Sequence, residues 1–152
     1  MQWFNCTFNQ LNIHQLYEIL KLRVDVFVVE QTCYYPEIDD LDRHDDTLHV
    51  FAYEGQHLIG YLRCLAPGVA YDNDAAIGRV VIAAEARGRN LGHELIQKGI
   101  IACENRWPDN AIHMSAQEHL QKYYHQHGFE TVGEPYLEDD IPHIGMLRSI
   151  VK

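Results

Sequence analysis

The stretch that decides the fold is Arg87-Gly88-Arg89-Asn90-Leu91-Gly92. It follows an apolar run, residues 76–83, that indicates a buried strand, and it precedes an amphipathic segment, residues 93–103, that predicts a helix. A tight turn with two glycines and two arginines between a strand and a helix is suited to binding an anion. The free N–H groups of a helix N-terminus point one way, and the helix dipole favours negative charge there. Together with the two arginines they predict a pyrophosphate site.

Two standard nucleotide-binding loops do not match this stretch. A P-loop needs Gly-Lys-Ser or Gly-Lys-Thr at the helix start, and the dinucleotide fingerprint needs Gly-x-Gly-x-x-Gly; neither is present. The stretch resembles instead the pyrophosphate loop of the GNAT N-acetyltransferases, Arg/Gln-x-x-Gly-x-Gly/Ala. Arg87 and Gly92 match its ends, and Asn90 takes the inner glycine position, which asparagine tolerates because it adopts left-handed backbone angles readily. An arginine-rich surface turn before a helix is the plainer alternative.

A second segment carries the same resemblance. Residues 111–116 indicate a short strand, and residues 117–129 indicate a helix that ends at Gly128. This segment is similar to the family's Asn-x-x-Ala-x-x-x-Tyr-x-x-x-Gly-Phe, with Gln117 in place of the Asn and Tyr124 at the Tyr. The resemblance implies that the Tyr124 hydroxyl protonates the departing thiolate of coenzyme A. A core tyrosine whose hydroxyl is satisfied is the structural alternative.

The remaining segments follow an order that the same family has. We expect a strand at 3–8, a helix at 11–29, an acidic loop at 33–46, strands at 48–54 and 57–65 around the hairpin turn Glu54-Gly55-Gln56, a strand at 75–83, and final strands at 130–136 and 143–151. The resemblance implies an α/β GNAT fold that spans residues 1–152 as one domain. That fold is a mixed, mainly antiparallel sheet, flanked by helices and splayed between its fourth and fifth strands to admit the cofactor.

Composition excludes several classes of protein. With 152 residues, 47% hydrophobic and 22% charged, the chain is globular rather than disordered. A net charge of −10 argues against nucleic-acid binding, which needs a basic face. No run approaches the roughly 20 apolar residues of a membrane span, and the start of the chain lacks the pattern of a signal peptide. Four scattered cysteines without a Cys-x-x-Cys pair indicate reduced thiols in a cytoplasmic protein.

Acidic residues are concentrated in residues 37–46 and 134–140. Two interpretations stay open: a solvated loop surface, or an acidic rim that attracts a cationic substrate. Histidines are numerous, but the nearest clusters, His125 with His127 and His44 with His49, lack the spacing of a structural zinc site and the His-Glu-x-x-His pattern. We therefore predict no metal.

Two further stretches, residues 22–42 and 138–146, are similar to the ElaA-type acyltransferases. Within the second, Pro142-His143-Ile144-x-Met146 also resembles the last strand of the glyphosate-type N-acetyltransferases. In those enzymes the histidine is the general base, which implies that role for His143. Alternation along a strand puts His143 on the opposite face from Ile144 and Met146. A satisfied, partly buried histidine is the alternative.

The same relatives imply a set of substrate residues. Arg23 matches an arginine that helps to bind the acidic end of a substrate, although an arginine on a helix face, paired with Asp25 or Glu30, is equally compatible with the sequence. If Arg23 binds substrate, the substrate carries a carboxylate or phosphate, which conflicts with an acidic rim that attracts cations. The sequence leaves both open. Glu30 and Gln31 could contact the amine.

The resemblance thus implies an acetyl-CoA-dependent N-acyltransferase that moves an acetyl group directly from coenzyme A to the amine of a small molecule. A backbone N–H near Val80 would polarise the thioester carbonyl. The residues expected to bind the cofactor are Val80, Val81, Ile82, Arg87, Gly88, Arg89, Asn90, Leu91, Gly92, His93 and Gln117. A protein amine as acceptor and a non-catalytic module that binds acyl-CoA remain as alternatives. The acceptor, the preferred acyl chain and the oligomeric state, a homodimer included, are left open.

Overall fold

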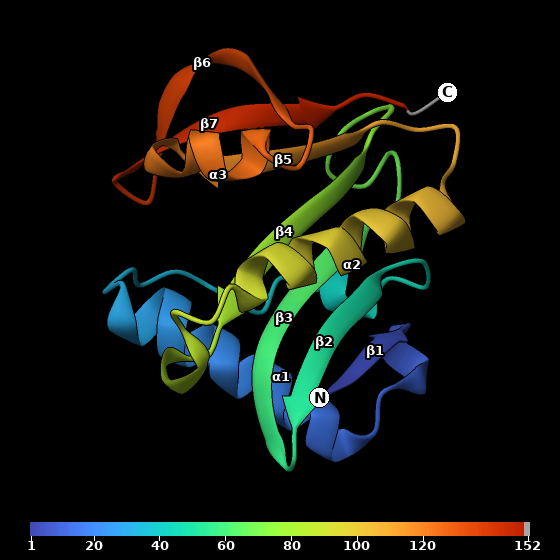
Figure 1. Ribbon diagram of the computed structural model, residues 1–152, viewed down its shortest axis with the longest axis vertical. Coiled ribbons are helices and arrows are strands. Elements are labelled where there is room, and N and C mark those ends of the chain that lie inside the picture. The colour runs from blue at the N-terminus through green and yellow to red at the C-terminus, as the bar shows by residue number, and fades with distance from the viewer. Residues whose placement is uncertain (151–152) are drawn as a thin grey trace.

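Seven strands form one sheet in the order β1-β2-β3-β4-β5-β7-β6 in the computed structural model, which describes residues 1–150. The strands are β1 (Gln2–Cys6), β2 (Leu48–Glu54), β3 (His57–Leu65), β4 (Ala75–Ile82), β5 (Ile112–Gln117), β6 (Glu130–Glu138) and β7 (Ile141–Arg148). The helices are α1 (Ile13–Arg23), which a π-helix (Val24–Glu30) continues, α2 (Leu91–Arg106) and α3 (Gln121–His125). Helix α1 lies behind the sheet in Figure 1 and α2 lies in front of it.

The sheet splays between β4 and β5. These two strands run parallel and pair only at Ala75 with Ile112 and at Ala76 with His113, whereas the other neighbouring strands are antiparallel. Beyond Ala76 the strands diverge, and Figure 1 shows β4 running away from the layer made by β5, β7 and β6. The predicted GNAT fold, including the splay between the fourth and fifth strands, is confirmed.

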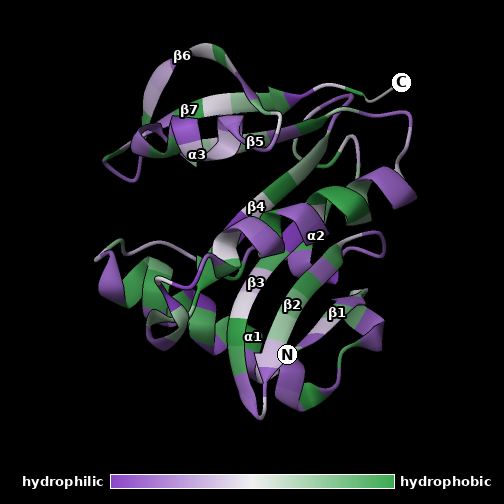
Figure 2. Ribbon diagram, viewed as in Figure 1, coloured by the Kyte–Doolittle hydropathy of each residue, from purple (hydrophilic) through white to green (hydrophobic). Residues whose placement is uncertain are grey.

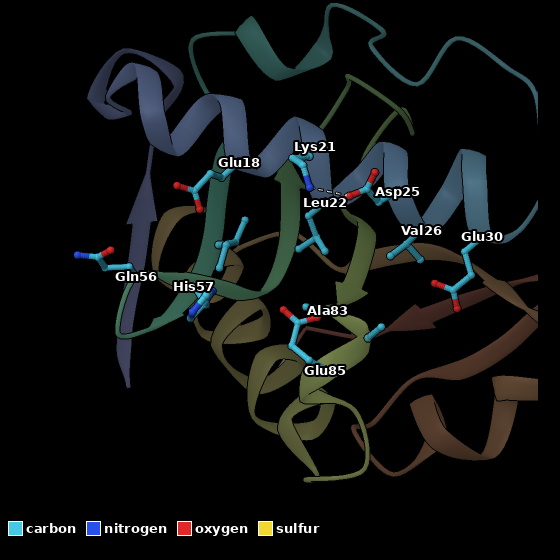
Figure 3. Close-up of a pocket in the computed structure, with 12 residues that line it drawn as sticks. Glu18, Lys21, Leu22, Asp25, Val26, Glu30, Gln56, His57, Ala83 and Glu85 are labelled. Atoms are coloured by element: carbon cyan, nitrogen blue, oxygen red, sulfur yellow. Dashed lines mark hydrogen bonds and ion pairs between the residues drawn. The ribbon is translucent and has the colours of Figure 1, made fainter.

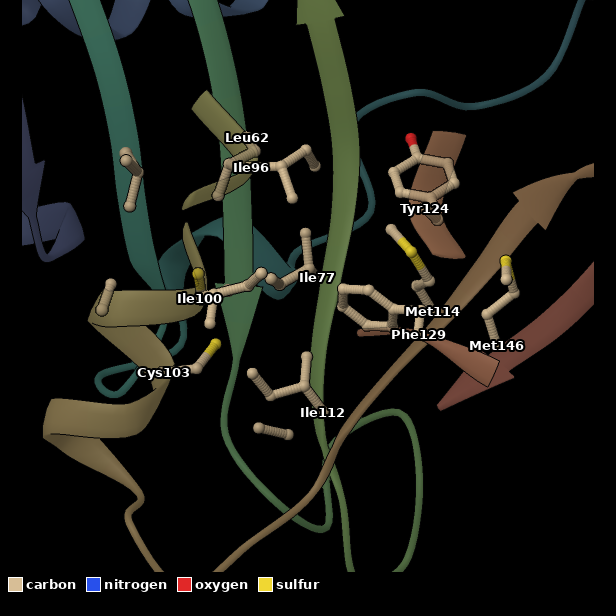
Figure 4. Close-up of a cluster of buried hydrophobic side chains, with 14 of the residues drawn as sticks. Leu62, Ile77, Ile96, Ile100, Cys103, Ile112, Met114, Tyr124, Phe129 and Met146 are labelled. Carbon is tan, nitrogen blue, oxygen red and sulfur yellow. The ribbon is translucent and has the colours of Figure 1, made fainter. Parts of the chain in front are cut away.

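The main core lies between the sheet and α2. Apolar and polar bands alternate along α1 and α2 in Figure 2, as expected for helices that bury one face. Ile77 of β4 and Met114 of β5 pack with Phe129 and Met146 in this core, and the ring of Tyr124 joins them (Figure 4). Each of these side chains is at most 6% exposed. A second core, around Phe51 and Tyr61, lies on the opposite side of the sheet with Ile19 of α1.

Some predicted boundaries were wrong. The first strand ends at Cys6 rather than residue 8, because Thr7 and Gln10 form a capping box that turns the chain into a short 3-10 helix. The segment expected as one helix over 117–129 contributes its first residue to β5, continues as a 3-10 turn and is α-helical only over α3. The expected end of the last strand, Val151, lies outside the described residues. Within residues 1–150 no helix is long and apolar enough to cross a bilayer.

Candidate active site

The gap between β4 and β5 opens into a cavity of about 770 Å³, here called the wedge cavity. This volume is in the range of a small-molecule or cofactor site. Its walls include eight residues that the sequence singled out, from four separate segments of the chain. These residues are Gln31, Val80, Val81, Ile82, Arg87, Gln117, Tyr124 and His143.

Tyr124 approaches the wedge cavity from the face that α2 covers. Its ring is 6% exposed and packs edge-on against Tyr123 and Phe129, with centroids 5.1 and 6.3 Å away. The hydroxyl points away from Met114 and Phe129 in Figure 4, and it has no hydrogen-bond partner among the described residues. Burial, with a smaller contribution from Tyr123, raises the pKa of Tyr124, so the phenol keeps its proton at neutral pH.

His143 approaches from the opposite face of the sheet. Ile144 and Met146 point into the main core, whereas His143 pairs across the strands with Gln117 and lines the wedge cavity. Its Nδ1 lies 2.7 Å from the carbonyl oxygen of Ile141, which can only accept, so Nδ1 carries the hydrogen. Nε2 is left as the basic nitrogen and lies 3.3 Å from the Glu138 carboxylate. The carboxylate can stabilise the imidazolium that forms when Nε2 takes a proton.

The edge of β4 that faces the cavity has no strand partner after Ala76 among the described residues. The β3–β4 register shifts between Tyr61 and Arg63, and Arg79 opposite this irregularity has a left-handed backbone (φ 55°). Such a bulge rotates the backbone groups that follow it. Val80, Val81 and Ile82 therefore present peptide groups to the wedge cavity rather than to another strand.

The phosphate loop (residues 87–93) lies at one end of the wedge cavity and leads into α2. Gly88 has φ 81°, and Asn90 is left-handed at φ 57° and occupies the N-cap position, where its side chain makes no capping hydrogen bond. The N–H groups of the first turn of α2 are therefore not satisfied by an Asn90 cap. Gly92 leaves room for the hydroxyl of Tyr123, which would have to move if this position carried a Cβ. Leu91 is buried in the core and anchors the turn.

Both arginines of the phosphate loop are paired with carboxylates. Arg87 makes two hydrogen bonds to Glu30, at 2.6 and 2.8 Å, and Arg89 makes two to Glu54, at 3.2 and 2.6 Å. All four side chains are between 42% and 48% exposed, so these pairs are screened by water and readily broken. His93 turns aside and shares a hydrogen bond of 2.8 Å with His127.

Arg23 lies outside the wedge cavity, which corrects its expected position at the substrate. Its side chain is 0% exposed and binds Glu37 at 2.6 Å and Asp42 at 2.7 Å. These pairs belong to a closed ring of alternating charges, here called the ion-pair ring. In order around the ring its members are Arg23, Glu37, Arg79, Asp39, Arg63 and Asp42. A substrate carboxylate could reach Arg23 only by displacing a buried carboxylate, since every arginine in the ring already has two.

The ion-pair ring attaches the loop after the π-helix to the sheet. Burial alone would raise the pKa of Asp42, but hydrogen bonds and charges from Arg23 and Arg63 outweigh it and hold that pKa below its usual range. The same balance, with Arg63 as the main cation, lowers the pKa of Asp39. Asp39 and Asp42 are therefore ionised at neutral pH, and the formal charges of the three arginines and three carboxylates of the ring balance. The acidic loop predicted from the sequence is, at these three positions, part of the interior.

Several cavity residues were not predicted. Tyr35 and Cys33 line it from the loop after the π-helix, and Ser115, Glu138 and Asp139 line it from β5 and the β6–β7 turn. Ser115 donates a hydrogen bond to Glu138 at 3.2 Å. Ser115 could have been predicted from the sequence, because side chains alternate along a strand and Ser115 therefore lies on the same face of β5 as Gln117. No sequence pattern predicts that Tyr35 lies at this site, since its position depends on how the ion-pair ring attaches the loop to the sheet.

A smaller cavity of about 410 Å³ lies between α1 and the ends of β3 and β4 (Figure 3). Figure 3 shows Glu18, Lys21 and Asp25 along the helix, with Lys21 paired to Asp25, and Glu85 on a separate segment across from them. Of the predicted site residues only Glu30 lines it, and neither Tyr124 nor His143 does. The wedge cavity is therefore the candidate active site. Among residues 1–150 no group of three or more His, Cys, Asp or Glu side chains is arranged to hold a metal ion.

Comparison with known proteins agrees with this geometry. The family model described as an acetyltransferase (GNAT) domain matches residues 19–150. The chain belongs to the GNAT acetyltransferase family. Protein ElaA of Escherichia coli is 39% identical over 155 residues, which cover 100% of this chain and 99% of ElaA. The resemblance to the ElaA-type acyltransferases is confirmed.

Solved structures of acyltransferases are also similar to this chain. An acyl-CoA N-acyltransferase from Pseudomonas aeruginosa is 47% identical, with a TM-score of 0.93 over 97% of this chain and 99% of its own. Escherichia coli ElaA superposes with a TM-score of 0.92 at 39% identity, over 98% and 100% of the two chains. This GNAT protein is thus an acyltransferase by family and fold. An aminoglycoside 6′-N-acetyltransferase complexed with coenzyme A shares the fold alone, with 14% identity, a TM-score of 0.72 and 98% of each chain covered.

Proposed function

We propose that this protein is an acetyl-CoA-dependent N-acetyltransferase that acts in the cytoplasm on the amine of a small molecule. The observation that carries the proposal is the wedge cavity, where a protonated phenol from one face of the sheet and a basic imidazole nitrogen from the other share one space. A module that only binds acyl-CoA would need neither group. Four free cysteines are compatible with a reducing compartment.

Backbone groups of the phosphate loop and of β4 would make most of the contacts with the cofactor. The phosphate loop would hold the pyrophosphate with N–H groups of α2, and Arg87 and Arg89 would exchange their carboxylate partners for phosphate oxygens. The free edge of β4 at Val80, Val81 and Ile82 would hydrogen-bond the pantetheine arm in the manner of a neighbouring strand. Gln117, across the splay, lines the opposite wall. The thioester would then lie between Tyr124 and His143.

The chemistry needs a base and an acid. A primary amine is protonated at pH 7, and with a reference pKa of about 10.4 its deprotonation costs about 4.6 kcal/mol. Nε2 of His143 takes this proton, and Glu138 stabilises the resulting charge. The amine nitrogen attacks the thioester carbon, an N–C bond forms and the C–S bond breaks, while a backbone N–H near Val80 stabilises the oxyanion. Tyr124 protonates the departing thiolate, and the attacking nitrogen then returns a proton to Tyr124. The amine therefore loses two protons: one ends on the thiol of coenzyme A, and the other leaves through His143.

Acetyl-CoA is expected to raise the melting temperature by about 5–10 °C at a concentration a hundredfold above its Kd, because it binds only the folded state. Arg87→Glu combined with Arg89→Glu should abolish this shift in differential scanning fluorimetry. Arg43→Glu combined with Arg106→Glu is the matched control, since both are exposed, ion-paired arginines away from the wedge cavity. A double variant of Arg87 and Arg89 that binds as tightly as the control would rule out the phosphate loop as the cofactor site.

Glu30→Gln should tighten the binding of acetyl-CoA by up to about fivefold, because it removes the competing carboxylate from Arg87.

His143→Ala is expected to lower kcat/KM by about 10²–10⁴-fold at pH 7, because the amine then lacks a general base. The wild-type kcat/KM should rise with pH over the range, about pH 5–8, in which histidine side chains lose their proton. The His143→Ala variant should lack this rise of kcat/KM over about pH 5–8. Its kcat/KM should partly recover in alkaline buffer, where more of the amine is already neutral. Thiol release measured across this pH range checks both expectations. A variant with the wild-type rate and the wild-type pH profile would assign His143 to structure alone.

A further inference from the structure

The charges around the wedge cavity indicate what kind of amine it accepts. Its cationic lining side chains are Arg79 and Arg87, apart from the histidines His119 and His143. Arg79 lies 2.8 Å from Glu37 and 3.4 Å from Asp39 in the ion-pair ring, and Arg87 is bound to Glu30. Arg79 is therefore committed to carboxylates of the protein itself. A substrate carboxylate at the acceptor side would find no uncompensated arginine there.

The carboxylates of the same wall are not neutralised in this way. Glu138 and Asp139, at the β6–β7 turn, line the cavity, and no lysine or arginine pairs with either among the described residues. The Oε2 atom of Glu138 accepts a hydrogen bond from Ser115 and lies 3.3 Å from His143, and the side chain is 51% exposed. Asp139 makes no side-chain ion pair within residues 1–150, and its backbone oxygen accepts from Cys33 at 3.9 Å. The acceptor side thus carries net negative charge.

Two tyrosines accompany these carboxylates, of which Tyr35 lines the cavity and Tyr136 does not. Tyr35 donates its hydroxyl hydrogen to Glu37 at 2.8 Å, and the guanidinium of Arg79 lies over its ring, 5.9 Å from the centroid. Tyr136 lies across the strands from His143, with ring centroids 6.3 Å apart. Tyrosine faces attract cations, and the face of Tyr35 is already engaged by Arg79. This contact commits Arg79 further to the protein itself, so the preference for a cationic ligand rests on the carboxylates Glu138 and Asp139.

We propose that the natural acceptor is an alkyl diamine or polyamine without a carboxylate. One amine reaches the thioester between Tyr124 and His143, and a second ammonium group is held by Glu138 and Asp139 at the mouth of the wedge cavity. This inference rests on the proposed N-acetyltransferase function and narrows its substrate. The acetyl transfer itself is unchanged: the near amine forms the N–C bond, and the far ammonium keeps its proton and its charge throughout.

Three amines of equal chain length test the proposal. They are 1-aminopentane, which lacks the second charge, 1,5-diaminopentane, which has it, and lysine, which adds a carboxylate to the diamine. We expect kcat/KM for 1,5-diaminopentane to exceed that for each of the others by about tenfold or more, since an oriented charge–charge contact is lost in one case and a repulsion is added in the other. The KM for the diamine should also rise with salt more steeply than that for 1-aminopentane. Equal or better use of 1-aminopentane or lysine would overturn the proposal.

Variants of the β6–β7 turn locate the contact. Asp139 and Asp140 both have left-handed backbones, at φ 50° and 64°, which asparagine tolerates, so each can be changed to Asn without backbone strain. Asp139→Asn should lower the diamine-to-monoamine ratio of kcat/KM about fivefold. Asp140→Asn removes the same charge from a residue that does not line the cavity, and it should leave that ratio unchanged. Equal effects of the two variants would show that only the net charge matters and would overturn the site.

The same measurements separate this inference from the function on which it rests. If the diamine is not acetylated while another amine of a wider panel is, the acceptor class is wrong and the N-acetyltransferase function stands. If acetyl-CoA neither shifts the melting temperature nor releases thiol with any amine, the proposed function itself fails. Glu138→Gln is uninformative on rate alone, because Glu138 also faces His143, so its readout is again the diamine-to-monoamine ratio.

Discussion

Arg23→Met should lower the free energy of unfolding by about 3–5 kcal/mol, because it removes one partner from a buried ion pair and leaves charge behind. Glu37 and Asp42 would each keep only one arginine of the ion-pair ring, in surroundings where their side chains are 2% and 5% exposed. Methionine matches the length of the arginine stem, so the loss is mainly electrostatic. Chemical denaturation with urea, analysed at constant m-value, measures the change.

Arg43→Met is the control for this variant. Arg43 belongs to the same loop and pairs with Asp40, but its side chain is 67% exposed, so its removal should change stability by no more than about 1 kcal/mol. The sign of the pH dependence gives a second readout. Since Asp42 has a lowered folded pKa, its pairing stabilises the fold above the unfolded pKa, near 4, and this contribution fades as pH falls through the folded pKa. The difference between wild type and Arg23→Met should therefore shrink below about pH 4. A pH-independent difference, or none, would show that the ring does not stabilise the fold.

The ion-pair ring also shows where sequence reasoning was incomplete. Arg63 and Arg79 each interrupt an apolar strand, and a charge in a strand buried on both faces has to be paired. The carboxylates that pair with them, Glu37, Asp39 and Asp42, come from the acidic loop, and this pairing was not predicted from the sequence. Which carboxylate meets which arginine depends on the path of the loop over the sheet, a long-range property that local patterns do not encode. The expected role of Arg23 was carried over from relatives and not from this geometry.

Boundaries were predicted where a turn has a strong local signature. The bounds of β2 and β3 are as predicted, because Gly55 supplies the left-handed residue that the hairpin requires (φ 62°). The β6–β7 hairpin was expected to have a long loop, whereas Asp139 and Asp140 form a tight turn with both residues left-handed. Asp-Asp is a weaker signature for such a turn than Asn-Gly or Asp-Gly. This difference matters for function, because the tight turn brings Glu138 to His143.

Tyr124→Phe should reduce kcat by about 10²–10⁴-fold while leaving the affinity for acetyl-CoA nearly unchanged. The variant removes one oxygen atom, which has no partner among the described residues, and keeps the ring that packs against Phe129. Stability should therefore change by no more than about 1 kcal/mol. Because burial keeps the phenol protonated, the hydroxyl is available as an acid at every pH at which His143 can act as the base. The loss should accordingly be similar across the pH range, unlike the loss in His143→Ala.

Tyr123→Phe is the matched control, since it removes the same atom from the neighbouring residue, which does not line the wedge cavity. Its hydroxyl lies against Gly92 at the start of α2, so any effect should appear in cofactor affinity and not in the chemical step. Single-turnover release of the thiol, measured with enzyme in excess over acetyl-CoA, isolates that step from product release. If Tyr124→Phe and Tyr123→Phe release thiol at the wild-type rate in this assay, the proton for the thiolate comes from elsewhere and Tyr124 is a packing residue whose hydroxyl only borders the cavity.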